Sequence, residues 1–329
     1  MTDAHRRAIV AWLYTGCLLI ALLVTVGGIT RLTGSGLSIT EWKVLMGTLP
    51  PLNADAWQEL WQKYQATPQY QQVNTHFTLE QFKTIFWWEY IHRVLARLLG
   101  VVFLLPFLWF LARGYLDRAL RNRVILIFAL GAFQGLLGWL MVASGLVDRP
   151  SVSHFRLAAH LLTALLTFSV TLWTALETGG RADGPSGRAF HPGIVAFTVL
   201  LVLQITWGAF VAGLKAGGIF NTFPLMGGSL FPPAFGNPFV DPATVQFVHR
   251  VLGTALFGFG LVLWQRLRRE GKPGIGAELG GAVTLQFGLG VLTILRWPSN
   301  PVFWGAVHQL GAVALLAATV RSLYRSRLP

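Results

Sequence analysis

Long apolar stretches alternate with short polar ones along the whole chain. Each apolar stretch is about 20 residues long, the length that an α-helix needs to cross the hydrocarbon core of a bilayer. Because every backbone polar group must be hydrogen-bonded inside the bilayer, such stretches form helices there. The pattern predicts eight membrane-spanning helices, near residues 8–30, 86–111, 124–146, 154–176, 192–213, 244–264, 275–295 and 303–322.

Two of the polar connections are long enough to carry structure of their own. In residues 31–85, the apolar residues of segment 53–64 recur every three or four positions, which is typical of an amphipathic helix on the bilayer surface. Later in this connection, Thr78 and Gln81 have the spacing of a capping box that begins the helix of the second span. The connection 214–243 is rich in glycine and proline and predicts an irregular lid.

The two halves of the chain resemble each other in sequence. Three short motifs of the first four spans recur in the last four, in the same order: Thr25–Gly28 with Thr206–Ala209, Phe133–Gly138 with Leu285–Gly290, and His160–Leu166 with His308–Leu316. An offset of four spans keeps the orientation across the membrane, so the axis of the repeat is predicted to run along the membrane normal. The predicted fold is an all-α polytopic membrane protein of two pseudo-symmetric four-helix bundles, residues 1–176 and 177–329.

The composition and charge agree with a membrane protein and predict its orientation. Of 329 residues, 53% are hydrophobic and 12% charged, whereas a soluble domain carries about a quarter charged residues. Basic residues cluster in the connections that follow even-numbered spans, which places these connections and both termini in the cytoplasm. They include Arg181 and Arg188. No basic patch interleaved with aromatic residues is present, so nucleic acid is not a predicted partner.

The N-terminus and the single cysteine narrow the location and the chemistry. Arg6 and Arg7 precede a long apolar run without a small-residue cleavage site, which predicts a retained first span. The lack of an Arg- and Ser-rich transit sequence favours a bacterial inner (plasma) membrane. With Cys17 as its one cysteine, the chain forms no internal disulfide, no four-cysteine zinc site and no iron–sulfur cluster of its own.

Four of the eight histidines lie in the first turns of even-numbered spans, two in each half, near the predicted outer face: His92, His160, His249 and His308. Histidines on facing helices form a natural pair of axial haem ligands, so each half is predicted to hold one haem. Zinc, with two ligands per half, is the weaker alternative; a proton relay and packed core histidines are the others. His154 is predicted to anchor a span at the interface. Three histidines are predicted to be solvated: His5, His76 and His191.

One position separates the two halves chemically. Glu89 lies one helical turn before His92, whereas the equivalent residue of the second half is Gln246. A carboxylate takes up protons and an amide does not, so the first half is predicted to carry the reaction, with Glu89 as catalytic base, and the second to transfer electrons. Arginines near the outer face are candidate partners of haem propionates, or side chains that snorkel or end a helix at the interface. They are Arg31, Arg93, Arg97 and Arg250.

Six motifs together resemble the haem A synthase family, in the branch shared by mitochondria and many proteobacteria. The resemblance covers nearly the whole chain and rests on the combination, since each motif alone is weakly specific. The motifs are Gly27–Ser38, Phe86–Arg93, Gln134–Trp139, Arg156–Leu161, Asn221–Met226 and Phe247–Arg250.

The resemblance implies an oxidoreductase that converts a methyl group of haem O into the formyl group of haem A, for use by cytochrome c oxidase. It implies that His92 and His160 ligate the iron of the substrate haem. It further implies that His249 and His308 ligate the iron of a permanent haem b cofactor. Glu89 matches the acidic residue of the family near the reacting site, and the formyl oxygen is expected to come from water.

The resemblance also implies partners and removes one electron route. Haem O is the expected substrate, and haem O synthase, cytochrome c oxidase assembly factors, membrane lipid and further copies of the chain are the expected partners. Some family members carry paired cysteines in their outward loops. This chain lacks them, so a mechanism that passes electrons through such a pair does not apply here.

The strongest alternative function is a non-enzymatic di-haem b-type electron carrier. Such carriers usually hold one haem near each membrane face, whereas all four histidines here lie near one face, and Glu89 has no use in pure electron transfer. A transporter with parallel repeats would need Gly or Pro breaks near the span midpoints, and Pro106 is the main one present. The prenyltransferase of the preceding step would need aspartate-rich loops for magnesium and diphosphate, which the chain lacks.

Overall fold

Eight long helices dominate the computed structural model, which describes residues 2–41, 49–147, 150–180 and 189–327. All eight are long and apolar enough to cross a membrane, which confirms the predicted spans. They are α1 (Asp3–Leu32), α4 (Leu79–Ala112), α5 (Arg118–Val147), α6 (His154–Gly179), α7 (Pro192–Gly213), α8 (Pro242–Arg269), α9 (Pro273–Arg296) and α10 (Pro301–Arg325). The shorter elements are α2 (Ala54–Gln65), α3 (Pro68–Gln72) and the 3-10 turn η1 (Ala216–Gly218).

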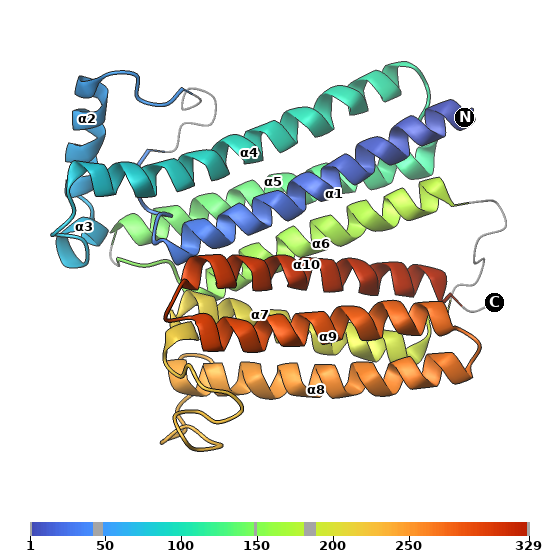
Figure 1. Ribbon diagram of the computed structural model, residues 1–329. Coiled ribbons are helices and arrows are strands. Elements are labelled where there is room, and N and C mark those ends of the chain that lie inside the picture. The colour runs from blue at the N-terminus through green and yellow to red at the C-terminus, as the bar shows by residue number, and fades with distance from the viewer. Residues whose placement is uncertain (1, 42–48, 148–149, 181–188, 328–329) are drawn as a thin grey trace.

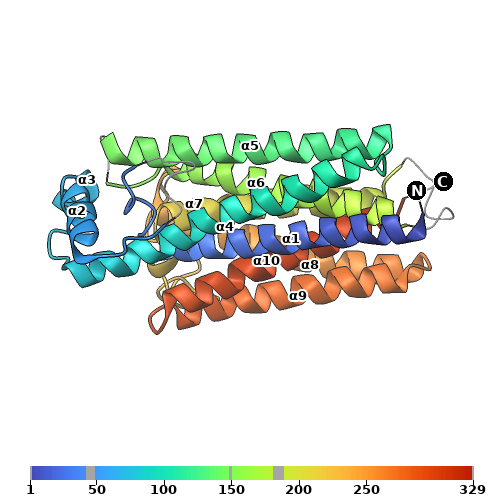
Figure 2. The same ribbon diagram turned by 90° about the horizontal axis from the view of Figure 1, so that it is seen from above.

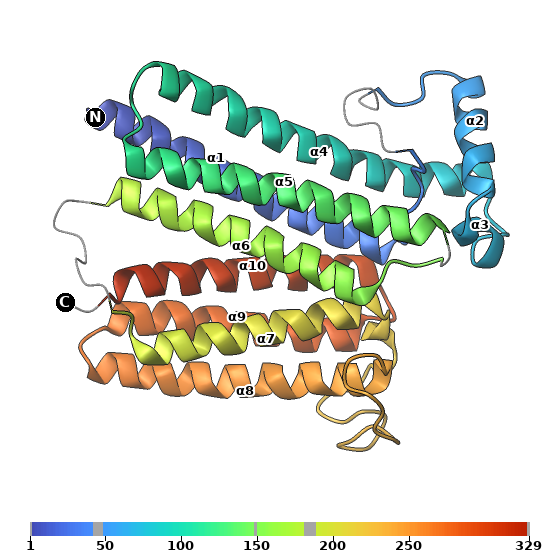
Figure 3. The same cartoon turned by 180° about the vertical axis from the view of Figure 1, so that it is seen from behind.

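The long helices form two groups of four, with the start of α1 and the end of α10 at the same end of the molecule (Figure 1). We call this the terminal end; the loop end, opposite, carries α2 and the two long connections. The first group contains α1, α4, α5 and α6, and the second contains α7 to α10 (Figure 3). The basic residues Arg181 and Arg188 lie outside the described residues.

Neighbouring helices pack in the same order in the two groups. In the first, α1 packs against α4 and α6, and α5 packs against α6; in the second, α7 packs against α8 and α10, and α9 packs against α10. The groups join where α1 meets α10 and where α6 meets α7. Exchanging the two groups turns one junction into the other, which fits the predicted pseudo-symmetric pair of four-helix bundles.

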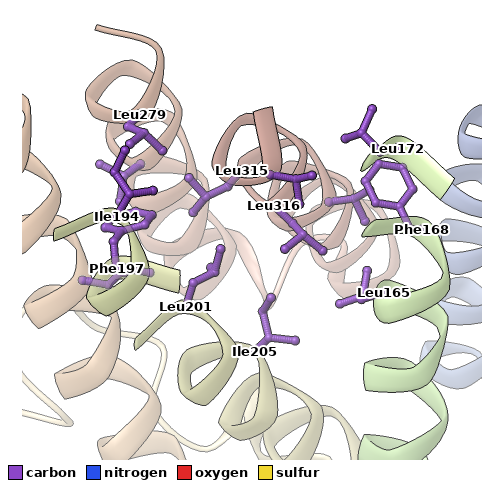
Figure 4. Packing of buried hydrophobic residues seen from close by; sticks show 14 of the residues in the cluster. Leu165, Phe168, Leu172, Ile194, Phe197, Leu201, Ile205, Leu279, Leu315 and Leu316 are labelled. Atoms are coloured by element: carbon purple, nitrogen blue, oxygen red, sulfur yellow. The ribbon is translucent and has the colours of Figure 1, made fainter. Parts of the chain in front are cut away.

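The largest apolar core lies at the junction of the two groups (Figure 4). Leu165 and Phe168 of α6, Leu201 and Ile205 of α7, and Leu316 of α10 are all buried in it. Lipid tails are as apolar as these side chains, so close packing, and not release from water, favours this contact inside a bilayer. The two groups therefore share one core and are not separated by a lipid-filled gap.

The helix α4 begins earlier than the predicted span because its start is capped. The backbone N–H of Thr78 donates to Oε1 of Gln81 (2.8 Å), and the backbone N–H of Gln81 donates to Oγ1 of Thr78 (3.4 Å). This is the predicted capping box. Asp241 caps α8 in a similar way, and the hydrogen bonds from Thr244 lower the pKa of its carboxyl.

The early turns of α4 provide the surface on which α2 packs. The rings of Trp61 and Tyr64 are buried, with centroids 5.4 Å and 5.0 Å from the ring of Phe82 on α4. The predicted amphipathic helix is present, but its apolar face lies against α4 and not only against lipid. The helix α2 lies at the loop end beside the start of α4 (Figure 2).

Ion pairs tie helix ends together at the terminal end. Glu270, just after α8, accepts hydrogen bonds from Nε of Arg266 (2.8 Å) and pairs with Nε2 of His191 (2.8 Å). Both partners lower the pKa of the Glu270 carboxyl, with Arg266 as the larger cause. His191 is only 3% exposed, so the prediction that it is solvated is wrong. Its ring is covered because the fold brings to it a carboxylate 79 residues away in the sequence.

Candidate functional site

The four predicted ligand histidines lie toward the loop end, two in each group of helices. His160, His249 and His308 lie about two turns after the starts of α6, α8 and α10, all of which begin at the loop end. His92 lies further from the start of its helix because α4 is extended by its capped turns. All four rings are partly buried. The structure thus brings the predicted residues to one end of the bundle.

Each of these rings rests against a glycine of a neighbouring helix. A Cβ atom added to any of the four glycines would lie 3.0–3.4 Å from the Cε1 atom of a histidine ring, closer than ordinary van der Waals contact. In each group, one of these glycines lies on the first helix and one on the third. The glycines of the two groups occupy equivalent positions of the repeat. The pairs are His92 with Gly27, His160 with Gly138, His249 with Gly208 and His308 with Gly290.

The third helix of each group also holds the histidine helix through a glutamine. Nε2 of Gln134 donates to the backbone carbonyl of His160 (2.9 Å), and Nε2 of Gln286 donates to that of His308 (3.0 Å). In the sequence, these glutamines and glycines stand out only as members of repeated motifs. Their contacts with the histidine helices become visible only in the folded structure. Their recurrence in both halves, at the same spacing, is the signal in the sequence that could have pointed to this role.

The pair in the second group has a geometry that suits metal ligation. The ring centroids of His249 and His308 lie 6.4 Å apart, with an interplanar angle of 86°. A metal ion lies about 2 Å from each histidine nitrogen that binds it, which places two ligand rings about 6 Å apart between centroids. The Nδ1 atom of His249 is buried without a hydrogen-bond partner among the described residues, and a buried polar atom of this kind is costly unless a ligand uses it.

The pair in the first group is more open. His92 and His160 both have a buried Nδ1 atom without a hydrogen-bond partner among the described residues. Within the described part of the chain, no ring contact like that of the second pair joins them. No cluster of three or more His, Cys, Asp or Glu side chains that would hold a metal ion is found among the described residues either. A closed zinc site therefore lacks ligands, whereas a haem needs only an axial pair.

Glu89 is buried and fully engaged with the loop that follows α1. Only 3% of it is exposed, and its Oε2 atom accepts hydrogen bonds from Oγ of Ser38 (2.7 Å) and from the backbone N–H of Ile39 (2.9 Å). Its Oε1 atom accepts one from Nη2 of Arg93 (2.6 Å). Arg93 in turn donates to the backbone carbonyls of Ile39 (3.0 Å) and Glu41 (2.9 Å). The acid and the arginine together hold the loop against α4, within one helical turn of His92.

Gln246 and Arg250 hold the loop that follows α7 in the corresponding way. Nε2 of Gln246 donates to the backbone carbonyls of Gly217 (3.4 Å) and Phe220 (3.2 Å). Arg250 donates to the carbonyls of Phe220 (2.7 Å) and Thr222 (2.8 Å). The first loop presents donors to Glu89, and the second presents acceptors to Gln246. The hydrogen bonds of the two loops are therefore enough to explain why one half has Glu89 and the other Gln246. The catalytic role of Glu89 stays a prediction.

The candidate propionate partners lie at the loop end, where backbone carbonyls already engage three of them. Arg93 and Arg250 bind loop carbonyls, and Nη2 of Arg31 donates to the carbonyl of Gly213 at the end of α7 (2.6 Å). Arg97 lies one turn after Arg93 on α4. The bond from Arg31 connects the two groups of helices, a role that the sequence did not predict. Contact with propionates stays a prediction for all four.

The remaining histidines lie away from these pairs. His76 is exposed, as predicted. His5 is partly buried and stacks on Tyr115 with 3.7 Å between ring centroids, so it is not simply solvated. His154 lies at the start of α6 between Phe155 (4.1 Å) and Phe210 (5.5 Å), a packed position near the loop end.

Comparison with known proteins connects this arrangement to one family. Residues 10–320 match the model of the COX15-CtaA family, described as cytochrome oxidase assembly protein. The chain is 44% identical to the heme A synthase of Paramagnetospirillum magneticum, over 98% of the chain and 95% of that relative. It is 45% identical to the heme A synthase of Bradyrhizobium diazoefficiens (97% and 91%) and 41% identical to that of Flavobacterium psychrophilum (98% and 98%). The chain, a multi-pass membrane protein, therefore belongs to the COX15-CtaA family of cytochrome oxidase assembly proteins.

Proposed function

We propose that the protein is a haem A synthase that oxidises a methyl group of haem O to the formyl group of haem A. The observation that carries the proposal is the duplicated histidine pair at one end of the bundle, each ring resting on a glycine, in a chain so similar to proteins named heme A synthase. A carrier that moves electrons across a membrane would gain little from two haems at one end. The duplication instead supports one site for a substrate haem and one for a cofactor haem.

The second half is proposed to hold the cofactor, a haem b, through His249 and His308. The support is the spacing and perpendicular arrangement of their rings. When bound, a haem held by His249 and His308 would supply one-electron transfer. The role of this half of the chain is to hold the cofactor rigidly, through Gly208, Gly290 and Gln286, so that its ligands do not change between turnovers.

The first half is proposed to bind the substrate haem between His92 and His160. Conversion of a methyl group to a formyl group adds one oxygen atom, from water, and releases four protons and four electrons. Glu89, one turn before His92, is proposed to accept protons and to stabilise positive charge on the substrate. The electrons pass to an acceptor outside this chain.

The distribution of charges supports a proposed orientation and location. Basic residues at the terminal end, including Arg123, Arg266 and Arg325, lie on the side that the positive-inside rule assigns to the cytoplasm. We place both termini in the cytoplasm of a bacterium, with the two histidine pairs near the outer face of its inner membrane. Haem O synthase and oxidase assembly factors are the proposed partners within the membrane.

Haem extraction from the purified protein tests the proposal. The protein is expressed in a host that makes haem O but no haem A, and its haems are separated by chromatography. We expect haem B together with haem O or haem A, and loss of haem A formation in His92→Ala while haem B remains bound. His249→Ala should instead lose haem B. Haem B at both sites, with no haem A formed by the wild type, would favour the di-haem carrier.

A further inference from the structure

The two groups of helices differ along one seam. In the second group, α8 packs along α9, and the rings of Phe257 and Phe287 stack across the seam with 4.5 Å between centroids and 9° between planes. In the first group, α4 and α5 touch sparsely, and Phe103 and Phe107 of α4 contact Phe128 of α5. These contacts lie toward the terminal end, and α4 and α5 diverge toward the loop end (Figure 2).

The internal repeat accounts for this difference. Phe257 lies eight residues after the ligand histidine of α8, and Gly100 lies eight residues after that of α4. Phe287 directly follows the glutamine of α9 that binds the next helix, and Gly135 directly follows the equivalent glutamine of α5. Both aromatic residues that close the second seam are therefore glycines in the first.

Among the described residues, no side chain replaces the two rings in the first group. A Cβ atom at Gly100 or Gly135 would meet no atom within 4 Å, and both glycines are exposed. The apolar residues beside them also face outward, with Val101 50% and Leu136 48% exposed. Gly135 lies about one turn from the glycine that supports His160. Gly100 lies about two turns beyond His92 on α4. The seam is thus open at the surface of the bundle within about two turns of the first histidine pair.

We propose that the seam between α4 and α5, at Gly100 and Gly135, is the lateral entrance through which haem passes between the bilayer and the first histidine pair. The stacked Phe257 and Phe287 close the corresponding path in the second half. This inference rests on the proposed function, in which one haem enters and leaves as substrate and product while the other stays. A haem is a flat and largely apolar macrocycle, so it dissolves in the bilayer and passes edge-on between helices where no bulky ring fills the seam.

Exchanging the residues of the two seams tests the entrance in the full-length protein with its resident haem. Zinc protoporphyrin in phosphatidylcholine vesicles is the probe, and its transfer to the protein is followed by fluorescence. Uptake of the probe is measured for the wild type and for His92→Ala. The difference between the two is the uptake at the first site. Gly100→Phe combined with Gly135→Phe should slow this uptake about tenfold, because packed rings then close the seam.

A matched control places the same rings elsewhere. Gly258→Phe combined with Gly288→Phe adds phenylalanines at exposed glycines next to the second seam, where a Cβ meets no atom within 4 Å, and should leave the uptake unchanged. The reciprocal variant, Phe257→Ala with Phe287→Ala, opens the second seam. Transfer of its resident haem to apomyoglobin should be about tenfold faster than from the wild type.

Each outcome separates the entrance from the proposed function. If Gly100→Phe/Gly135→Phe keeps its resident haem and takes up the probe at the wild-type rate, the entrance is refuted and the proposed function stands. If the wild type shows no uptake that depends on His92, the proposed function fails and the entrance fails with it. If the glycine variant does not fold, the reciprocal variant Phe257→Ala/Phe287→Ala decides. The proposal is refuted if this variant loses its resident haem no faster than the wild type does.

Discussion

At the scale of single residues, the acid that distinguishes the two halves has a structural and a chemical role to separate. Glu89 accepts hydrogen bonds from the loop after α1, whereas Gln246 donates to the loop after α7. Each side chain matches the donors or acceptors of its own loop. An amide at position 89 would therefore disturb the loop even if no proton were ever transferred there. A useful test must change the loop contact and the carboxylate separately.

Comparing Ser38→Ala with Glu89→Gln makes this separation. Ser38→Ala removes one donor to the carboxylate and should cost about 1.5–3 kcal/mol of stability, with most haem A formation retained. Glu89→Gln leaves Arg93 buried without its counter-charge, should cost about 3–5 kcal/mol, and should abolish haem A formation. Thermal unfolding and the haem A yield per folded molecule are the measurements. A Glu89→Gln protein with a normal yield per folded molecule would leave Glu89 as a loop anchor only.

The site residues that the sequence predicts are recognised from local patterns and the repeat. Those that it misses have partners far away in the sequence. The histidines were found because the repeat places them at matching depths. The partners of Glu89 were not, because Ser38 lies 51 residues earlier and reaches it only through the fold. The burial of His191 was missed for the same reason. Local patterns determine which residues share a helix face, and tertiary packing determines which of them meet.

At the scale of helices, hydropathy predicts the spans well because a bilayer leaves the backbone no alternative to helix. It predicts neither their capped extensions nor how closely two of them approach. Toward the terminal end, α1 packs against α4 where Gly16 faces the buried ring of Phe103. The same ring contacts Phe128 of α5. This aromatic contact fixes α4 at one end and leaves its other end free to diverge from α5.

A side chain at Gly16 should therefore disturb the packing of α1 against α4. The Cβ atom of Gly16→Ala would overlap the ring of Phe103, and we expect a loss of about 1–3 kcal/mol from overpacking. Gly281→Ala on α9 is the control, because its Cβ meets no atom within 4 Å, and alanine stabilises a helix by up to about 1 kcal/mol relative to glycine. Thermal unfolding in detergent measures both variants. Equal stability of the two would show that the ring of Phe103 moves aside for the added methyl group without loss of packing.

At the scale of the whole molecule, the two junctions between the groups are related by the repeat but differ chemically. Where α1 meets α10, Nε2 of Gln309 donates to the backbone carbonyl of Val24 (2.9 Å), and Gly28 leaves room for the amide. Where α6 meets α7, the corresponding residues are Leu161 and Ala209, which belong to an apolar cluster. Gln309 directly follows the ligand His308, so the polar junction connects the second histidine pair to the wall of the first site.

A double-mutant cycle across the polar junction tests this connection. Gly28→Val would push its side chain into the amide of Gln309 and should cost about 1–3 kcal/mol. Gln309→Ala removes one hydrogen bond, worth about 1 kcal/mol. In the double variant the amide is no longer there to collide with, so the combined loss should fall short of the sum by about 0.5–3 kcal/mol.

The control for this cycle combines Gln309→Ala with Gly281→Val, whose site is exposed and in contact with nothing within 4 Å. Distant and independent sites should add to within about 0.5 kcal/mol. The absorbance spectrum of the resident haem should change in Gly28→Val, because Gln309 adjoins His308 in the sequence, and should not change in the control. An additive cycle with an unchanged spectrum would mean that the two halves are held together by their apolar core alone.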